Sequence, residues 1–188
     1  MNPFYVELDT LGVALDLRRM GLTEDGLVQG DGPLRAALAE MAALEGGAIA
    51  NPSEGRMVGH YWLRAPELAP EHGMTRGIRM AQTMVERFVA ELDGRFRTVL
   101  VVGIGGSALG PQLLAGGLAA PGARRTLKFL DNTDPEGFAR TLYGVDPKDT
   151  LVLVVTKSGG TPETVTGWRR VEALYEAAGV PFEDHAVA

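Results

Sequence analysis

The sequence predicts an α/β protein with a doubly wound parallel sheet, incomplete at its C-terminal end and preceded by a mostly helical region. Three apolar, β-branched runs at 98–102, 126–130 and 151–155 are typical of buried parallel strands. A helix-forming segment follows each run, and right-handed crossovers between such units give a parallel sheet. We therefore expect a helical region over 1–96 and a sheet domain over 97–188.

The first 32 residues carry little periodic signal. Gly26, Gly30 and Gly32 predict a loop that ends near Pro33. Alanine and leucine at helical spacing then predict a helix over 33–44, which Gly46-Gly47 would end. A second helix over 74–92 is strongly amphipathic, so its apolar face should pack against a core. That face comprises Met74, Ile78, Ala81, Met84, Val85, Phe88, Val89 and Leu92.

Between these helices, Arg56, His60 and Arg64 lie four residues apart, and a helix here would put all three on one face. Two interpretations remain open for this group. It could be a structural cluster with satisfied partners, or it could be a wall that faces an anionic ligand.

The sheet domain contains clear helix boundaries. The strand over 98–102 enters a glycine cluster, and a helix should begin at about Ser107. Asp134-Pro135 predicts an N-cap and first residue of a helix to about Tyr143. Thr161 and Pro162 predict the same arrangement for a helix that ends at Gly179. Residues 184–188 resemble the start of a fourth strand, and we expect the chain to be part of a longer protein.

Two loops carry the chemistry of an anion site. Each follows a strand and precedes a helix, so both should lie at the carboxyl edge of the sheet, where ligands bind. Glycines expose backbone N–H groups, hydroxyls donate hydrogen bonds, and one of only three lysines supplies a positive charge. Either loop alone could be a plain turn, but the pair favours a phosphate monoester. The candidates are Gly105, Gly106, Ser107, Thr156, Lys157, Ser158 and Thr161.

A dinucleotide site is the competing interpretation. Residues 103–108 fit G-x-G-x-x-A, and Asp131 ends the next strand. However, Asp131 follows Gly103 by 28 positions, against about 20 in the dinucleotide fingerprint. Such a site also needs no second hydroxyl-rich loop. A mononucleotide P-loop is excluded because its motif is missing from the sequence.

Composition excludes several other functions. The net charge of −6 and the lack of a basic stripe argue against nucleic-acid binding. With no cysteine, disulfides and thiolate zinc sites are impossible, and His60, His72 and His185 lack metal spacing, so we expect no metal site. Acidic Glu7 and Asp9 replace the basic start of a signal peptide, and no apolar run could span a membrane. We expect a cytoplasmic protein without a membrane partner.

Three segments in order resemble the glucose-6-phosphate isomerase family. They are ANPSEGRMVGHYWLR, GIGGSALGP and VTKSGGTPET, and they cover roughly residues 50–165. The resemblance implies a sugar-isomerase (SIS) fold, with a five-stranded parallel sheet that occurs twice per subunit. It assigns sugar-phosphate binding to Ser107, shaped by Gly105 and Gly106, and to the hydroxyls around Lys157. Many members read S-K-T-F-T-T in the second loop, and here Ser158, Gly159 and Gly160 replace T-F-T.

The resemblance also implies the reaction. Family members interconvert glucose 6-phosphate and fructose 6-phosphate through a cis-enediol, without a cofactor and as homodimers. Their proton-transferring glutamate, arginine, histidine and lysine come later in the chain. We therefore expect this N-terminal fragment, with a truncated first SIS domain, to bind phosphate but to hold no catalytic residue. The alternatives are a non-catalytic sugar-phosphate-binding SIS module and, less favoured, an NAD-binding oxidoreductase domain.

Overall fold

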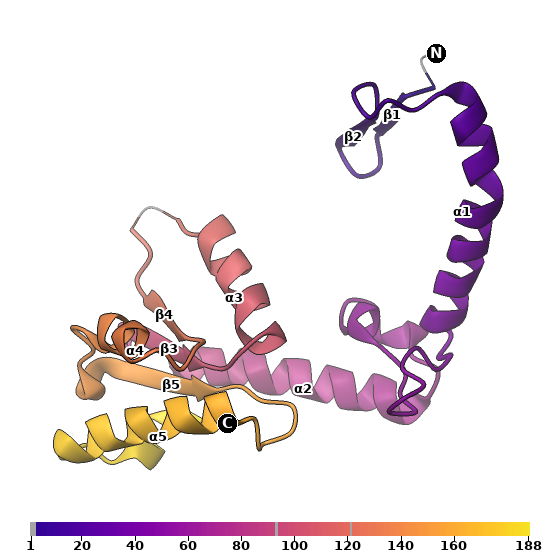
Figure 1. The fold of residues 1–188 in the computed structure, drawn as a ribbon. Helices are drawn as coiled ribbons and strands as arrows, with labels where there is room; N and C mark the ends of the chain where they lie inside the picture. The colour runs from indigo at the N-terminus through magenta and orange to yellow at the C-terminus, as the bar shows by residue number, and fades with distance from the viewer. Residues whose placement is uncertain (1–2, 93, 121) are drawn as a thin grey trace. The chain divides into compact units, whose positions relative to one another are not determined.

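The computed structural model describes residues 3–92, 94–120 and 122–188 (Figure 1). The chain divides into two compact units, Met1–Glu86 and Arg87–Ala188. None of the helices in the described parts of the chain is long and apolar enough to span a bilayer.

The first unit begins with a β-hairpin that the sequence did not predict. Strands β1 (Tyr5–Leu8) and β2 (Val13–Asp16) pair antiparallel around a turn with Gly12 at φ 65°. Val6 lies opposite Leu15 and Leu8 opposite Val13, so these four apolar residues share one face. Each strand has only four residues, which is too short for alternation to stand out in the sequence.

Helix α1 (Glu24–Glu45) corrects the predicted loop before Pro33. The helix begins at Glu24 because the Thr23 hydroxyl accepts a hydrogen bond from the Gly26 N–H at 3.1 Å and two acidic residues occupy its first turn. Pro33 lies inside the helix. The predicted C-terminal end is confirmed, since Gly46 is the C-cap and Gly47 follows with φ 98°.

The segment after α1 does not form a single helix. Asn51 and Arg56 form an antiparallel bridge, and only His60–Leu63 and Pro66–Leu68 make 3-10 turns, η1 and η2. Arg56 therefore precedes the first helical turn, and the predicted shared face of Arg56, His60 and Arg64 is wrong.

Trp62 anchors this segment. Its side chain is buried, and its indole Nε1–H donates to the Glu45 carbonyl at 2.9 Å, which ties η1 to the end of α1. Gly59 is required here, because a Cβ would stand 2.1 Å from the indole Cε3. Helix α2 (His72–Glu91) follows close to the predicted range, although none of its described side chains is buried, so its apolar face is not covered here.

The second unit confirms the parallel sheet. Strands β3 (Thr98–Val102), β4 (Thr126–Leu130), β5 (Thr150–Val154) and β6 (Ala186–Val187) lie in the order β4-β3-β5-β6, and every neighbouring pair is parallel. The predicted fourth strand is β6, which pairs with β5 at two residues. From the central strands, the chain crosses in one direction to β4 and in the other to β6, as in a doubly wound sheet.

Helices connect the strands. They are α3 (Gly106–Gly117), α4 (Pro135–Leu142) and α5 (Pro162–Ala177), with 3-10 turns η3 (Pro147–Asp149) and η4 (Phe182–Asp184). Asp134 caps α4 as predicted, since its carboxylate accepts from the Gly137 N–H at 2.6 Å. The predicted end of α5 is also confirmed, because Gly179 follows with φ 65°.

Side-chain alternation along the strands separates two faces of the sheet. Val102 and Leu130 face α5, where a Cβ on Gly167 would come within 3.0 and 3.3 Å of them. Leu127 and Phe129, on the other face of β4, lie against α3. Figure 1 correspondingly shows α3 and α5 on opposite sides of the sheet. The core lies on the α5 face and contains Leu100, Val102, Leu130, Val152, Val171, Tyr175 and Val180.

Short hydrogen bonds join residues at the amino-terminal ends of the strands. Buried Tyr175 donates its hydroxyl to the Thr150 carbonyl at 2.7 Å, and burial raises the pKa of that hydroxyl. The Arg97 guanidinium contacts the Asp149 carboxylate at 2.6 Å, and the two backbones are also bonded at 3.1 Å. This end of the sheet is opposite the end at which the two predicted loops begin.

Candidate functional site: two loops at the carboxyl edge of the sheet

The two predicted loops begin side by side. The first loop (residues 103–107) follows β3, and the second loop (residues 156–161) follows β5, its neighbour in the sheet. From these two strands the chain crosses in opposite directions, so the loops flank the point where the strand order reverses. Open α/β sheets bind ligands in the crevice at this point.

Backbone contact holds the starts of the loops together. The Val155 N–H donates to the Val102 carbonyl at 2.8 Å, and the Gly103 N–H donates to the Leu130 carbonyl at 3.2 Å. A Cβ on Gly103 would stand 2.8 Å from the Val155 carbonyl oxygen and 3.0 Å from the Ser107 Cβ. Position 103 therefore has no room for a side chain. Gly103 was predicted as the start of the first loop but not as a site residue, and its place at a strand end was the available signal for this close contact.

The first loop leads directly into α3. Gly105 is the N-cap and has φ 58° and ψ −124°, a conformation that favours glycine. The Ala108 and Leu109 N–H groups donate to its carbonyl at 3.0 and 2.9 Å. Glycine offers no side chain as a cap, so α3 begins without a side-chain hydrogen bond. A Cβ on Gly106 would meet no atom within 4 Å, which leaves open space above the first turn. Ser107 is half-buried beside it.

The second loop gathers three hydroxyls. The Thr161 Oγ1 lies 3.4 Å from the Thr156 Oγ1 and 3.4 Å from the Ser158 Oγ. The Gly159 N–H donates to Thr156 Oγ1 and the Gly160 N–H to Ser158 Oγ, each at 3.3 Å. All four distances are long for hydrogen bonds, so these groups can exchange their partners for ligand oxygens at small cost.

Thr161 occupies the predicted N-cap of α5, but its hydroxyl does not cap the helix. It faces the other hydroxyls of the loop instead. By contrast, Thr23 and Asp134 each accept a hydrogen bond from the first turn of their helices. The two helices that begin at the loops, α3 and α5, thus lack the side-chain caps that α1 and α4 have. The first turn of α3 contains no acidic residue, so its partial positive charge is available to an anion, whereas the first turn of α5 already contains Glu163.

All seven predicted site residues belong to these loops or to the helix starts that follow them. The structure brings Thr156, Ser158 and Thr161 into mutual contact. Lys157 is exposed on the same loop. Arg56 and His60 belong to the first unit, where Arg56 pairs with Glu54 at 3.3 Å and the His60 ring packs on Tyr61.

Asp131, the acidic residue of the dinucleotide interpretation, already has two partners. Its carboxylate accepts from the Gln112 amide at 2.6 Å and from the Asn132 amide at 3.0 Å. Its carboxylate is thus already held by contacts within the chain. Among the described residues, no three His, Asp or Glu side chains gather closely enough to hold a metal ion.

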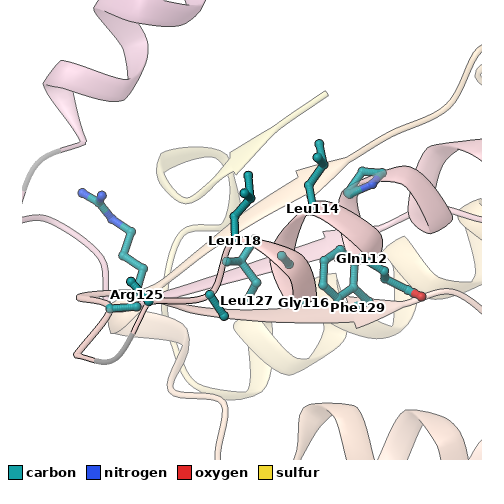
Figure 2. A pocket seen from close by; sticks show the side chains of 12 residues that line it. Gln112, Leu114, Gly116, Leu118, Arg125, Leu127 and Phe129 are labelled. Atoms are coloured by element: carbon teal, nitrogen blue, oxygen red, sulfur yellow. The ribbon is translucent and has the colours of Figure 1, made fainter. Parts of the chain in front are cut away.

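A pocket of about 840 Å³ lies away from these loops, between α3 and β4 (Figure 2). Its walls are mainly apolar, and Figure 2 shows Leu114 and Leu118 on one side and Leu127 and Phe129 on the other. None of the predicted phosphate-binding residues lines it. The pocket exists because few side chains cover α3. The polar side chains of the two loops lie elsewhere, at the carboxyl edge of the sheet.

Known proteins resemble this chain over most of its length. The family model described as Phosphoglucose isomerase matches residues 35–188. The glucose-6-phosphate isomerase of Thermosynechococcus vestitus is 46% identical over 185 residues, which covers 93% of this chain and 35% of the relative. That of Geobacter sulfurreducens is 46% identical over 189 residues, covering 94% and 36%. The chain spans about a third of the length of these curated relatives.

Solved structures agree. The crystal structure of a glucose-6-phosphate isomerase from Chlamydia trachomatis has a TM-score of 0.80 and 28% identity, and the match covers 89% of this chain and 35% of that one. A Thermus thermophilus protein described as hypothetical has a TM-score of 0.59 at 28% identity, covering 86% and 34%. By sequence and by structure, the chain belongs to the phosphoglucose isomerase family.

Proposed function

We propose that the two loops bind the phosphate group of a sugar phosphate, within an isomerase that interconverts glucose 6-phosphate and fructose 6-phosphate. Residues 97–188 would then form the start of its first SIS domain. The observation that carries this proposal is the contact of Gly103 with Val155, which joins two loops rich in glycine and hydroxyl groups at the reversal point of the sheet. The curated relatives named glucose-6-phosphate isomerase support the choice of substrate.

The chemistry of the loops suits a phosphate monoester dianion. Its oxygens need several donors that converge from different directions, together with positive charge. The hydroxyls of Thr156, Ser158 and Thr161 provide donors, and Lys157 provides a compact charge. The first turn of α3 adds backbone N–H groups and the positive end of its dipole.

In the complete enzyme, phosphate binding would position the reacting carbons. Holding the phosphate fixes the distance from the loops to C1 and C2, between which the proton moves in an aldose–ketose isomerisation. Binding energy from this non-reacting group can thus contribute to the rate. The resemblance assigns the proton-transferring glutamate to a later part of the family's chain. This chain would therefore supply phosphate binding and not the base.

Calorimetric titration with 6-phosphogluconate tests the assignment. We expect the chain to bind this ligand, and Lys157→Ala and Ser107→Ala each to weaken binding by roughly tenfold or more, the scale of a lost hydrogen bond to a charged group. Lys148→Ala is the matched control, because Lys148 lies in η3 before β5 and should leave the affinity unchanged. An unaltered affinity in Lys157→Ala, or no binding by the folded chain, would refute the site. A response to NAD alone would favour the dinucleotide interpretation.

A further inference from the structure

Helix α3 carries part of the proposed phosphate site, yet few contacts hold it. Only Ala108 of its described residues is buried. Leu109, Leu113 and Leu114 are 60–76% exposed. Most of the stability of a helix in a protein comes from packing of its apolar face. Because little of α3 is packed, the position of its first turn depends strongly on its polar contacts with the sheet. That first turn contains Ser107 and the N–H groups that face the proposed ligand.

One polar contact joins α3 to the sheet near the loops. The Gln112 Nε2–H donates to the Asp131 Oδ2 at 2.6 Å, and Figure 2 shows Gln112 on α3 beside Phe129 of β4. Asp131 directly follows Leu130, whose carbonyl accepts from the Gly103 N–H at 3.2 Å. The same end of β4 therefore holds both the start of the first loop and the second turn of the helix that the loop enters.

Asp131 accepts from amide donors on both of its oxygens. Its second oxygen, Oδ1, accepts from the Asn132 Nδ2–H at 3.0 Å. Both neighbours are thus amide donors, and a carboxylate accepts from both. An asparagine of the same shape could keep both contacts, because its oxygen can accept from Asn132 and its NH₂ can donate to the Gln112 amide oxygen once that amide turns over. The charge of the carboxylate strengthens both bonds, as in other charge-assisted pairs.

We propose that Gln112 and Asp131 are positioning residues that fix the first turn of α3, and with it Ser107, against the carboxyl end of β4. Neither residue contacts the ligand. The pair acts through the helix, so its loss moves the donors of the first loop relative to those of the second. This inference rests on the proposed phosphate site and adds to it the contact that sets the geometry of one loop.

Reversing the polarity of the pair provides the test. Gln112→Glu places two carboxylates face to face, whereas Asp131→Asn leaves two amides that can still pair, without the charge. The double variant restores a donor and an acceptor, with the carboxylate now on α3, and it keeps an oxygen for Asn132. Each chain is titrated with 6-phosphogluconate, and its thermal unfolding is recorded. Gln82→Glu is the matched control, because it makes the same substitution at the Gln82–Leu63 contact in the first unit.

We expect Gln112→Glu to raise the dissociation constant roughly tenfold at a temperature where it is folded, the effect seen when a residue that orients a ligand-binding group is lost. Asp131→Asn should raise it by less than about threefold, because a neutral amide pair remains. The double variant should return to within about twofold of the original value, because its pair is intact again. A Gln112→Glu chain that unfolds at lower temperature but binds normally, or a double variant that stays weak, would overturn the positioning role. If the original chain does not bind and Lys157→Ala behaves like it, the proposed phosphate site itself is refuted.

Discussion

Gly103 and Gly106 lie three residues apart in one loop, and the structure predicts that the same substitution at each has opposite effects on the stability of the fold. At Gly103 an added Cβ would stand 2.8 Å from the Val155 carbonyl oxygen, which is backbone and cannot rotate away, and 3.0 Å from the Ser107 Cβ. Gly103→Ala must therefore push β3 and β5 apart where the two loops begin. The φ of Gly103 is not in the left-handed region, so the whole effect is steric.

The loss of stability expected for Gly103→Ala follows from this steric overlap. Insertion of a methyl group into a closely packed site costs about 1–3 kcal/mol. For a protein of this size each kcal/mol lowers the unfolding midpoint by about 2–4 °C, so Gly103→Ala should lower it by roughly 2–12 °C. Affinity for 6-phosphogluconate should fall as well, because the two loops separate.

Gly106→Ala is the matched control for stability. Its Cβ would meet no atom within 4 Å, its φ is not positive, and it occupies the first position of α3. Replacement of glycine by alanine at such a position stabilises a protein by about 0.4–1 kcal/mol, because the unfolded chain loses freedom. The methyl group would nevertheless project into the space that a phosphate needs, so affinity should fall while the midpoint stays or rises.

Thermal unfolding followed by circular dichroism and calorimetric titration together check both variants. A Gly103→Ala chain that unfolds within about one degree of the original would refute the close approach of Gly103 to Val155, given the size of the overlap. A Gly106→Ala chain that binds 6-phosphogluconate normally would refute the placement of the anion above the first turn of α3.

Other residues allow further tests. Thr161→Val should weaken 6-phosphogluconate binding about fivefold in titration, the scale of one neutral hydrogen bond, while the unfolding midpoint changes little because this hydroxyl does not cap α5. Tyr175→Phe removes the donor to the Thr150 carbonyl and should lower the free energy of unfolding by about 1–3 kcal/mol in urea titration. Because burial raises the pKa of Tyr175 above its unfolded value, the original chain should lose stability as the pH rises above about 10, and Tyr175→Phe should lose less over that range. Asp134→Ala removes the acceptor of the Gly137 N–H and should cost about 0.5–2 kcal/mol by the same urea assay, without a change in ligand affinity.

The sheet domain could be predicted from the sequence because its signals are local and agree with one another. The three apolar runs, the Asp134-Pro135 and Thr161-Pro162 helix starts, and Gly179 all identify boundaries within one or two residues. The two loops were predicted to lie at the same edge of the sheet because parallel strands bring their carboxyl ends together there, whereas the adjacency of β3 and β5 came from the structure. Family resemblance then supplied the choice of ligand.

The remaining features depend on information that a local pattern does not contain. The strands of the hairpin in the first unit have only four residues each, too few for a clear alternating pattern. Helix α1 begins early because Thr23 caps it, although three glycines and Pro33 in its first half disfavour a helix. The Arg56 segment has helical spacing but forms a bridge, because Pro52 and Gly55 create a turn. The contact of Gln112 with Asp131 joins residues 19 positions apart, which no spacing rule predicts.

The two ends of the strands differ in the lengths of their hydrogen bonds. At the amino-terminal end, Tyr175 and Arg97 make bonds of 2.6–2.7 Å, while the hydroxyls of the second loop are joined by contacts of 3.3–3.4 Å. We therefore expect substitutions in the second loop to cost little folding stability, because they disturb only these long contacts. The loop proposed to meet the ligand can then vary in sequence while the strands that carry it keep their register.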